Sequence, residues 1–193
     1  TGSGKTTAIL RSGLGFPLAE AFGQRTVEGV GGTRNCDWLI TDEAVLIDTA
    51  GRYTTQDSER GADRAEWLAF LDLLRRHRGR RALNGVVVAI GLAELATADS
   101  DERARHASAI GRRLNELQLK LGARLPVYVL FTKTDLVSGF VEYFDRMSRE
   151  EREQVWGVTF GYDDGSGDSD VVAEFPAAFD ELVQRVVEQQ LDR

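Results

Sequence analysis

The chain has one cysteine, three lysines and no long apolar run, and each shortage narrows what it can be. Cys36 has no second cysteine to pair with, so we expect no internal disulfide and favour a reducing compartment. No stretch approaches the ~18 apolar residues that span a bilayer, and no signal peptide is visible. We therefore expect any membrane attachment to lie outside these 193 residues.

Positive charge is also scarce, since 24 lysines and arginines face 31 acidic residues for a net charge of −7 at pH 7. Binding along nucleic acid needs a basic face, so we expect no nucleic-acid partner. The three lysines, Lys5, Lys120 and Lys133, stand beside 21 arginines. Where arginine is so strongly preferred, a lysine indicates a place that needs a compact ammonium, such as one beside a phosphate.

Apolar runs that alternate with helical patterns predict one α/β domain over residues 1–193. Strands are expected at 36–41, 44–50, 85–92, 126–132 and 154–160, the first two of them antiparallel. Helices are expected from near Lys5, over 64–78, and over 176–192 from Pro176, with a flexible acidic loop at 163–170. Two capping boxes predict further helix starts, one of Asp99 with Glu102 before a long helix and one of Ser148 with Glu151 before a short helix. Strands separated by helices imply crossover connections, and hence a three-layer fold with a mainly parallel sheet.

The first residues, TGSGKTT, match the second half of the phosphate-binding loop G-x-x-x-x-G-K-[ST]. In such a loop Lys5 would reach the β- and γ-phosphates, and the Thr6 hydroxyl would hold Mg²⁺. Glycines let backbone N–H groups approach the phosphate oxygens, and the remaining contacts would come from Gly2, Ser3, Gly4 and Thr7. The start of the loop and its leading strand are missing, so we expect a segment cut from a longer chain. A plain glycine-rich turn before a helix is the alternative.

A second motif, Asp48-Thr49-Ala50-Gly51, ends a predicted strand. Asp48 would project at the carboxyl edge of the sheet, where ligands bind in such folds, and would hold Mg²⁺ through water. The N–H of Gly51 would contact the γ-phosphate, and the loop after it could move when that phosphate leaves. An ordinary strand-ending turn would look the same.

A third motif, Thr132-Lys133-Thr134-Asp135, again follows a predicted strand. The Asp135 carboxylate could accept hydrogen bonds from N1–H and the 2-amino group of guanine, a donor pair that adenine lacks. The stem of Lys133 would lie along the base plane. The alternative is a charged surface loop.

The three motifs, in this order, resemble those of P-loop GTPases. That resemblance implies a further Mg²⁺-binding threonine in a mobile loop, for which Thr33 fits best and Thr26 is the runner-up. Many GTPases place a water-orienting glutamine directly after the second motif. Arg52 stands there instead, and Gln56 cannot be assumed to replace it. We expect hydrolysis to be slow or to depend on a group from another subunit.

Longer segments resemble the IcmF/TssM family of type VI secretion: GGTRNCDWLITDEAVLIDTAGRYTTQD (31–57), LDLLRRHRGRRALNGVVVAI (71–90), PVYVLFTKTDLVSGF (126–140) and EEREQVWGVTF (150–160). The resemblance implies an NTPase domain of a large protein, at the cytoplasmic face of the bacterial inner membrane. It also implies partners among the other membrane-complex and baseplate components of the secretion apparatus.

The sequence thus predicts a Mg²⁺-dependent NTPase, with GTP favoured and ATP left open. The alternative is a docking module that keeps the P-loop fold, does not hydrolyse nucleotide and binds other secretion components.

Overall fold

The computed structural model describes residues 2–17, 36–49, 60–79, 82–152, 154–161 and 170–191. Contacts divide the chain into two units, Thr1–Val141 and Glu142–Arg193. No described helix is both long enough and apolar enough to cross a bilayer.

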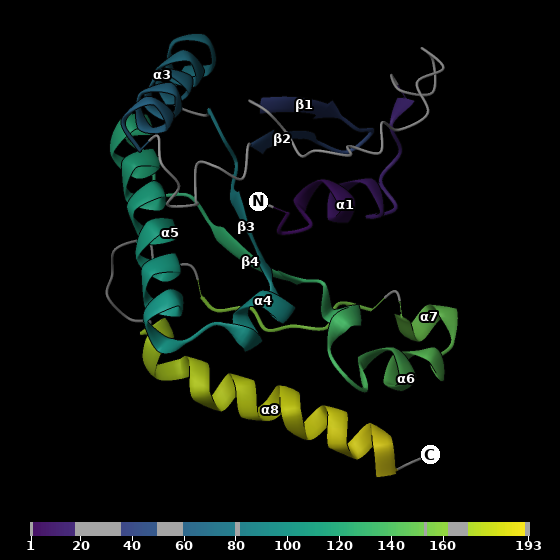
Figure 1. The fold of residues 1–193 in the computed structure, drawn as a ribbon. Helices are drawn as coiled ribbons and strands as arrows, with labels where there is room; N and C mark the ends of the chain where they lie inside the picture. The colour runs from purple at the N-terminus through teal and green to yellow at the C-terminus, as the bar shows by residue number, and fades with distance from the viewer. Residues whose placement is uncertain are drawn as a thin grey trace. The chain divides into compact units, whose positions relative to one another are not determined.

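The first unit alternates strands with helices (Figure 1). Its described elements are α1 (Lys5–Leu10), β1 (Cys36–Ile40), β2 (Val45–Thr49), α3 (Arg60–Arg78), β3 (Val86–Gly91), α4 (Leu92–Thr97), α5 (Ser100–Leu121), β4 (Val127–Thr132) and the 3-10 turn η3 (Thr134–Leu136).

The described strands form two pairs, and each pair agrees with the pattern of the sequence. β1 and β2 are antiparallel, with Cys36 opposite Thr49, as the short turn between them predicts. β3 and β4 are parallel, and their register runs from Val86 beside Val127 to Gly91 beside Thr132. Parallel strands need a crossover connection, which α4 and α5 supply here.

The long helix α5 begins where its capping residues predict. The Asp99 carboxylate accepts a hydrogen bond from the Glu102 N–H at 2.7 Å, and the Glu102 carboxylate accepts one from the Asp99 N–H at 3.3 Å. This reciprocal pair satisfies backbone donors that the first turn of a helix leaves without partners. The predicted capping box is therefore confirmed, and it fixes where the crossover turns back toward β4.

One hydrophobic core supports both pairs of strands. It is built mainly from α3 and α5, which lie side by side (Figure 1). Ile47 of β2 and Val86 of β3 both pack against its buried residues, Trp67, Leu71, Leu74, Ala82, Leu117 and Leu121. Lys120 also pairs with Asp72 across the two helices at 3.1 Å. The shared core holds two strands on one helical layer: β2, whose carboxyl end leads to the second predicted motif, and β3, the partner of the strand that leads to the third.

The second unit corrects two expectations, the first of which is the strand predicted at 154–160. Those residues form no strand. Val155 is 95% exposed, and Trp156 packs edge-on against Phe144 of α6 (Phe140–Asp145), with ring centroids 5.9 Å apart. Apolar character alone does not make a strand when no neighbouring strand pairs with the segment. The short helix α7 (Arg149–Arg152) before it does carry the predicted capping pair of Ser148 and Glu151.

The last helix, α8 (Val171–Leu191), begins earlier than the predicted start at Pro176, so the range 176–192 is wrong at that end. The reason is Asp170, whose carboxylate accepts hydrogen bonds from the N–H groups of Val172 at 3.1 Å and Ala173 at 3.3 Å. Pro176 consequently lies inside the helix. Apart from Asp170, the loop predicted at 163–170 lies outside the described residues.

Candidate functional site

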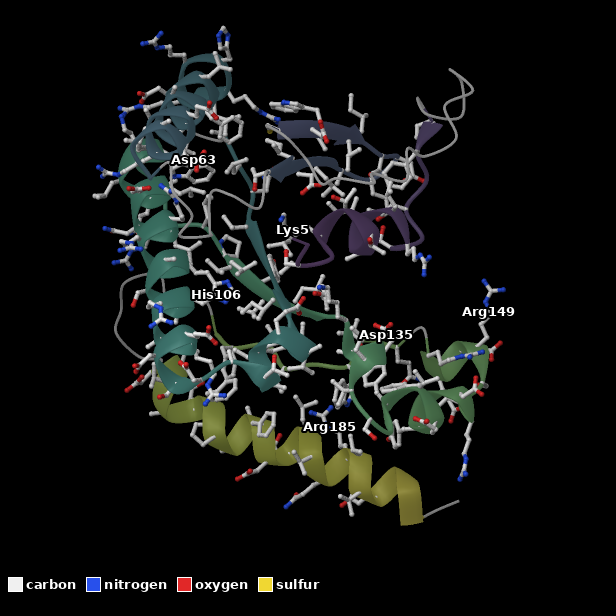
Figure 2. All side chains as sticks on the ribbon, viewed as in Figure 1. Lys5, Asp63, His106, Asp135, Arg149 and Arg185 are labelled. Carbon is white, nitrogen blue, oxygen red and sulfur yellow. The ribbon has the colours of Figure 1, made fainter. Side chains whose placement is uncertain are left out.

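The glycine loop that opens the chain is shaped by backbone conformations that favour glycine. Gly2 and Gly4 have φ values of 96° and 74°, in the left-handed region that side chains disfavour. A Cβ on Gly4 would also lie 3.4 Å from the side chain of Thr132, so the loop passes close to the end of β4. Directly after this turn Lys5 begins α1 (Figure 2), with its Nζ 3.5 Å from the Ser3 hydroxyl.

The first and second motifs meet at Thr6 and Asp48. The Thr6 hydroxyl donates a hydrogen bond of 2.5 Å to an Asp48 carboxylate oxygen, across 42 positions of sequence. Asp48 lies near the end of β2 and is only 2% exposed, so the residues packed around it fix its position. A buried carboxylate needs such partners to offset its lost hydration.

This hydroxyl–carboxylate pair fits Mg²⁺. Magnesium prefers oxygen ligands and takes one or two from the protein, with the rest from water and phosphate. Among the described residues, no group of three or more His, Cys, Asp and Glu side chains could hold a metal ion. The pair of Thr6 and Asp48 is a candidate for holding the metal because of its own contact and chemistry.

The third motif meets the glycine loop. The hydroxyl of Thr132, 8% exposed, donates a 2.5 Å hydrogen bond to the backbone carbonyl of Ser3. Lys133 follows with φ 57°, the one positive value among the described non-glycine residues. Such a conformation costs about 1–2 kcal/mol, and strained residues cluster at functional sites. Asp135 is exposed on η3 (Figure 2).

Some predicted site residues are not placed by these contacts. Thr7 lies on the exposed side of α1. Five candidates lie outside the described residues, namely Thr26, Thr33, Gly51, Arg52 and Gln56. The structure thus brings together the glycine loop, Asp48 and the start of the third motif, while the mobile-loop threonine and the residues after Thr49 stay predictions from sequence.

A cavity of about 110 Å³ lies beside the glycine loop. Ser3, Lys5 and Thr49 line it together with apolar residues of β3 and α5, among them Val86, Val88, Ile110, Leu114 and Leu117. Its small volume and largely apolar walls do not suit a triphosphate. It adjoins β3, which is paired only with β4 among the described strands, just as β2 is paired only with β1.

Sequence reasoning missed Glu94, which forms an ion pair with Lys133. Glu94 lies on the short helix α4, which the sequence pattern did not predict, and its partner is 39 positions away. The only available signal was its place just after a predicted strand, where functional side chains gather in parallel sheets.

The thiol of Cys36 is influenced by the same site. Partial burial and, to a smaller extent, the negative charges of Asp37 and Asp48 together raise its pKa to about 11. At pH 8 only ~0.1% of the thiol would be thiolate, the reactive form. We predict slow alkylation by iodoacetamide at pH 8, with a rate that climbs until pH 11 in the native protein. In urea the profile should shift to lower pH, and native reactivity at pH 8 equal to that in urea would contradict this prediction.

Two comparisons with known proteins find a match. The profile of the IcmF-related N-terminal domain matches residues 60–193. A type VI secretion system component of Pseudomonas aeruginosa, TssM1, is 55% identical over 192 residues, which is 100% of this chain and 17% of TssM1. The chain therefore spans less than a fifth of that relative. No solved structure matches it.

Proposed function

Since the chain belongs to the IcmF/TssM family of type VI secretion, we propose that it forms a Mg²⁺-dependent P-loop domain that binds GTP, or less selectively ATP, and hydrolyses it slowly. One observation carries this proposal. Three motifs, far apart in the sequence, are joined by two hydrogen bonds, from Thr6 to Asp48 and from Thr132 to the Ser3 carbonyl. A chance set of surface turns would have no reason to meet.

Each part of the site has a chemical role. The glycine loop offers backbone N–H groups to phosphate oxygens, and the Lys5 ammonium supplies a compact positive charge beside them. Thr6 and Asp48 would hold Mg²⁺, which when bound neutralises phosphate charge. Asp135 is exposed just after β4, and its carboxylate would accept hydrogen bonds from the N1–H and the 2-amino group of guanine.

The proposed fold is a three-layer, small-GTPase-like P-loop fold that needs one more strand between β2 and β3. Both strands pack on the same core, and the small apolar cavity adjoins β3, Thr49 and the start of the glycine loop. A strand there, contributed by residues before Thr1 in a longer chain, would pair with both and cover the apolar lining. Its side chains would fit a narrow space that is unsuited to nucleotide.

The rate of hydrolysis follows from the residue after the second motif. Arg52 cannot orient a water as a glutamine amide does, because a guanidinium donates hydrogen bonds but accepts none. Turnover by the isolated domain would therefore be slow. A faster reaction would need a water-orienting group from Gln56 or from a second protein.

The wider role is proposed from the family. The domain would lie at the cytoplasmic face of the bacterial inner membrane, attached through parts of a longer chain. Its nucleotide state would support assembly or energising of the secretion apparatus through contacts with other membrane-complex and baseplate components.

Calorimetry tests the proposal against its alternative. The domain, extended at its N-terminus to include the proposed strand, should bind one Mg²⁺–GTP per chain, and removal of Mg²⁺ by EDTA should weaken binding by at least tenfold. Absence of binding of GTP and ATP at millimolar concentration would instead favour the docking module. One observation supports that alternative. Tyr128 and Val129 of β4 are 59% and 55% exposed, and exposed apolar surface of this kind is often a site of contact with other proteins.

A further inference from the structure

Glu94 and Lys133 lie at the same edge of the parallel pair β3–β4. Glu94 is on α4, which begins directly after β3, and Lys133 directly follows β4. The register places Gly91 beside Thr132, so the two chains leave the sheet together. The Lys133 ammonium and the Glu94 carboxylate form an ion pair that joins the segment after β3 to the segment after β4.

Lys133 is also held at its other end. Its backbone is in the left-handed conformation, and the preceding Thr132 is bonded to the Ser3 carbonyl. Its Cγ lies 3.9 Å from the position that a Cβ on Gly4 would take, so the aliphatic stem runs beside the glycine loop. A lysine side chain otherwise samples many rotamers, and anchoring its head as well as its base removes most of that freedom.

The pair contributes little to folding. The side chains of Glu94 and Lys133 are 58% and 29% exposed, and exposed ion pairs add little to the free energy of unfolding. The hydrogen bond from Lys133 lowers the pKa of the Glu94 carboxyl, as expected when a carboxylate accepts from an ammonium. An ion pair with little effect on stability, next to a strained residue of a candidate site, is better explained by orientation of that residue.

We propose that Glu94 is a positioning residue for base recognition: it holds the head of Lys133 so that the stem forms a preset wall for the purine of the bound nucleotide. The inference rests on the proposed function, because it needs a nucleotide at this site. Without Glu94 the stem would have to be ordered at the moment of binding, and affinity for the base would fall. The phosphate contacts of the glycine loop would be unaffected.

The test compares nucleotide with inorganic triphosphate, which has no base. In the full-length protein, Glu94→Gln should weaken Mg²⁺–GTP binding about tenfold by calorimetry, because a neutral amide holds the ammonium less firmly and the stem must then be ordered on binding. Binding of Mg²⁺–triphosphate should change less than about twofold. Glu43→Gln is the matched control, since it neutralises another exposed glutamate, in the turn between β1 and β2, and should change neither.

A double mutant shows whether Glu94 acts through Lys133. In a Lys133→Met background, Glu94→Gln should cost no further affinity for GTP, because there is no ammonium left to hold. The inference is overturned if Glu94→Gln leaves GTP binding unchanged, if both ligands weaken equally, or if the two substitutions are additive. A wild-type protein that binds neither GTP nor triphosphate overturns the proposed function as well, whereas the other outcomes leave that function standing.

Discussion

Replacement of Lys5 by alanine is expected to weaken Mg²⁺–GTP binding on the order of 100-fold and to abolish release of phosphate. The ammonium of Lys5 is the candidate positive charge of the glycine loop, and its 3.5 Å approach to the Ser3 hydroxyl shows that it bends back over that loop. Lys5→Arg should fail as well, since a planar guanidinium does not fit the space that the loop leaves for a compact ammonium. Titration with a fluorescent GTP analogue measures both effects.

Lys120→Ala is the matched control for this prediction. It removes a lysine whose pairing with Asp72 joins α3 to α5, so it removes the same charge outside the candidate site. GTP affinity should be unchanged within about twofold, because a partly exposed ion pair contributes little to stability. If Lys5→Ala and the wild type bind GTP with equal affinity, the role that we assign to the glycine loop is wrong.

The second large effect is expected from Asp135→Asn, which should shift base preference from guanine to xanthine. The carboxylate accepts from the 2-amino group of guanine, whereas an asparagine amide can donate to the carbonyl that xanthine carries at that position. Affinity for GTP should fall on the order of 100-fold or more, and xanthosine triphosphate should become the tighter ligand. Binding of ATP should hardly change, since adenine lacks the donor pair that Asp135 recognises.

Competition between the three nucleotides measures this shift in one series. Asp101→Asn, an exposed aspartate in the first turn of α5, makes the same chemical change away from the motifs and should leave base preference as it is. If ATP binds the wild type as tightly as GTP and Asp135→Asn alters neither, the guanine assignment is wrong, although a site that binds both nucleotides would remain.

Local chemistry made much of this fold predictable. The Asp99–Glu102 box fixes the start of α5 because both partners lie within one turn. The two short strands at Cys36 and Val45 are joined by a turn too short for anything but an antiparallel pair. The glycine loop was recognisable from its match to half of a phosphate-binding pattern, and in the structure Gly2 and Gly4 adopt φ values that other residues disfavour.

What sequence could not supply depended on contacts between distant residues. The segment at 154–160 is apolar, yet it became no strand because strand formation requires a partner edge. Pro176 has the pattern of a helix start, but α8 begins earlier because the Asp170 carboxylate accepts a hydrogen bond from the Val172 N–H in its first turn. Glu94 could not be singled out from the sequence, because its partner Lys133 is 39 positions away. The parallel register of β3 and β4 brings the two residues together.

A crystal structure with Mg²⁺ and a non-hydrolysable GTP analogue tests the central claim most directly. We predict one nucleotide, with its phosphates at Lys5, its metal ion at Thr6 beside Asp48, and its base between Asp135 and the stem of Lys133. Crystals that stay free of nucleotide at saturating concentration, or that hold it away from these residues, would contradict the account.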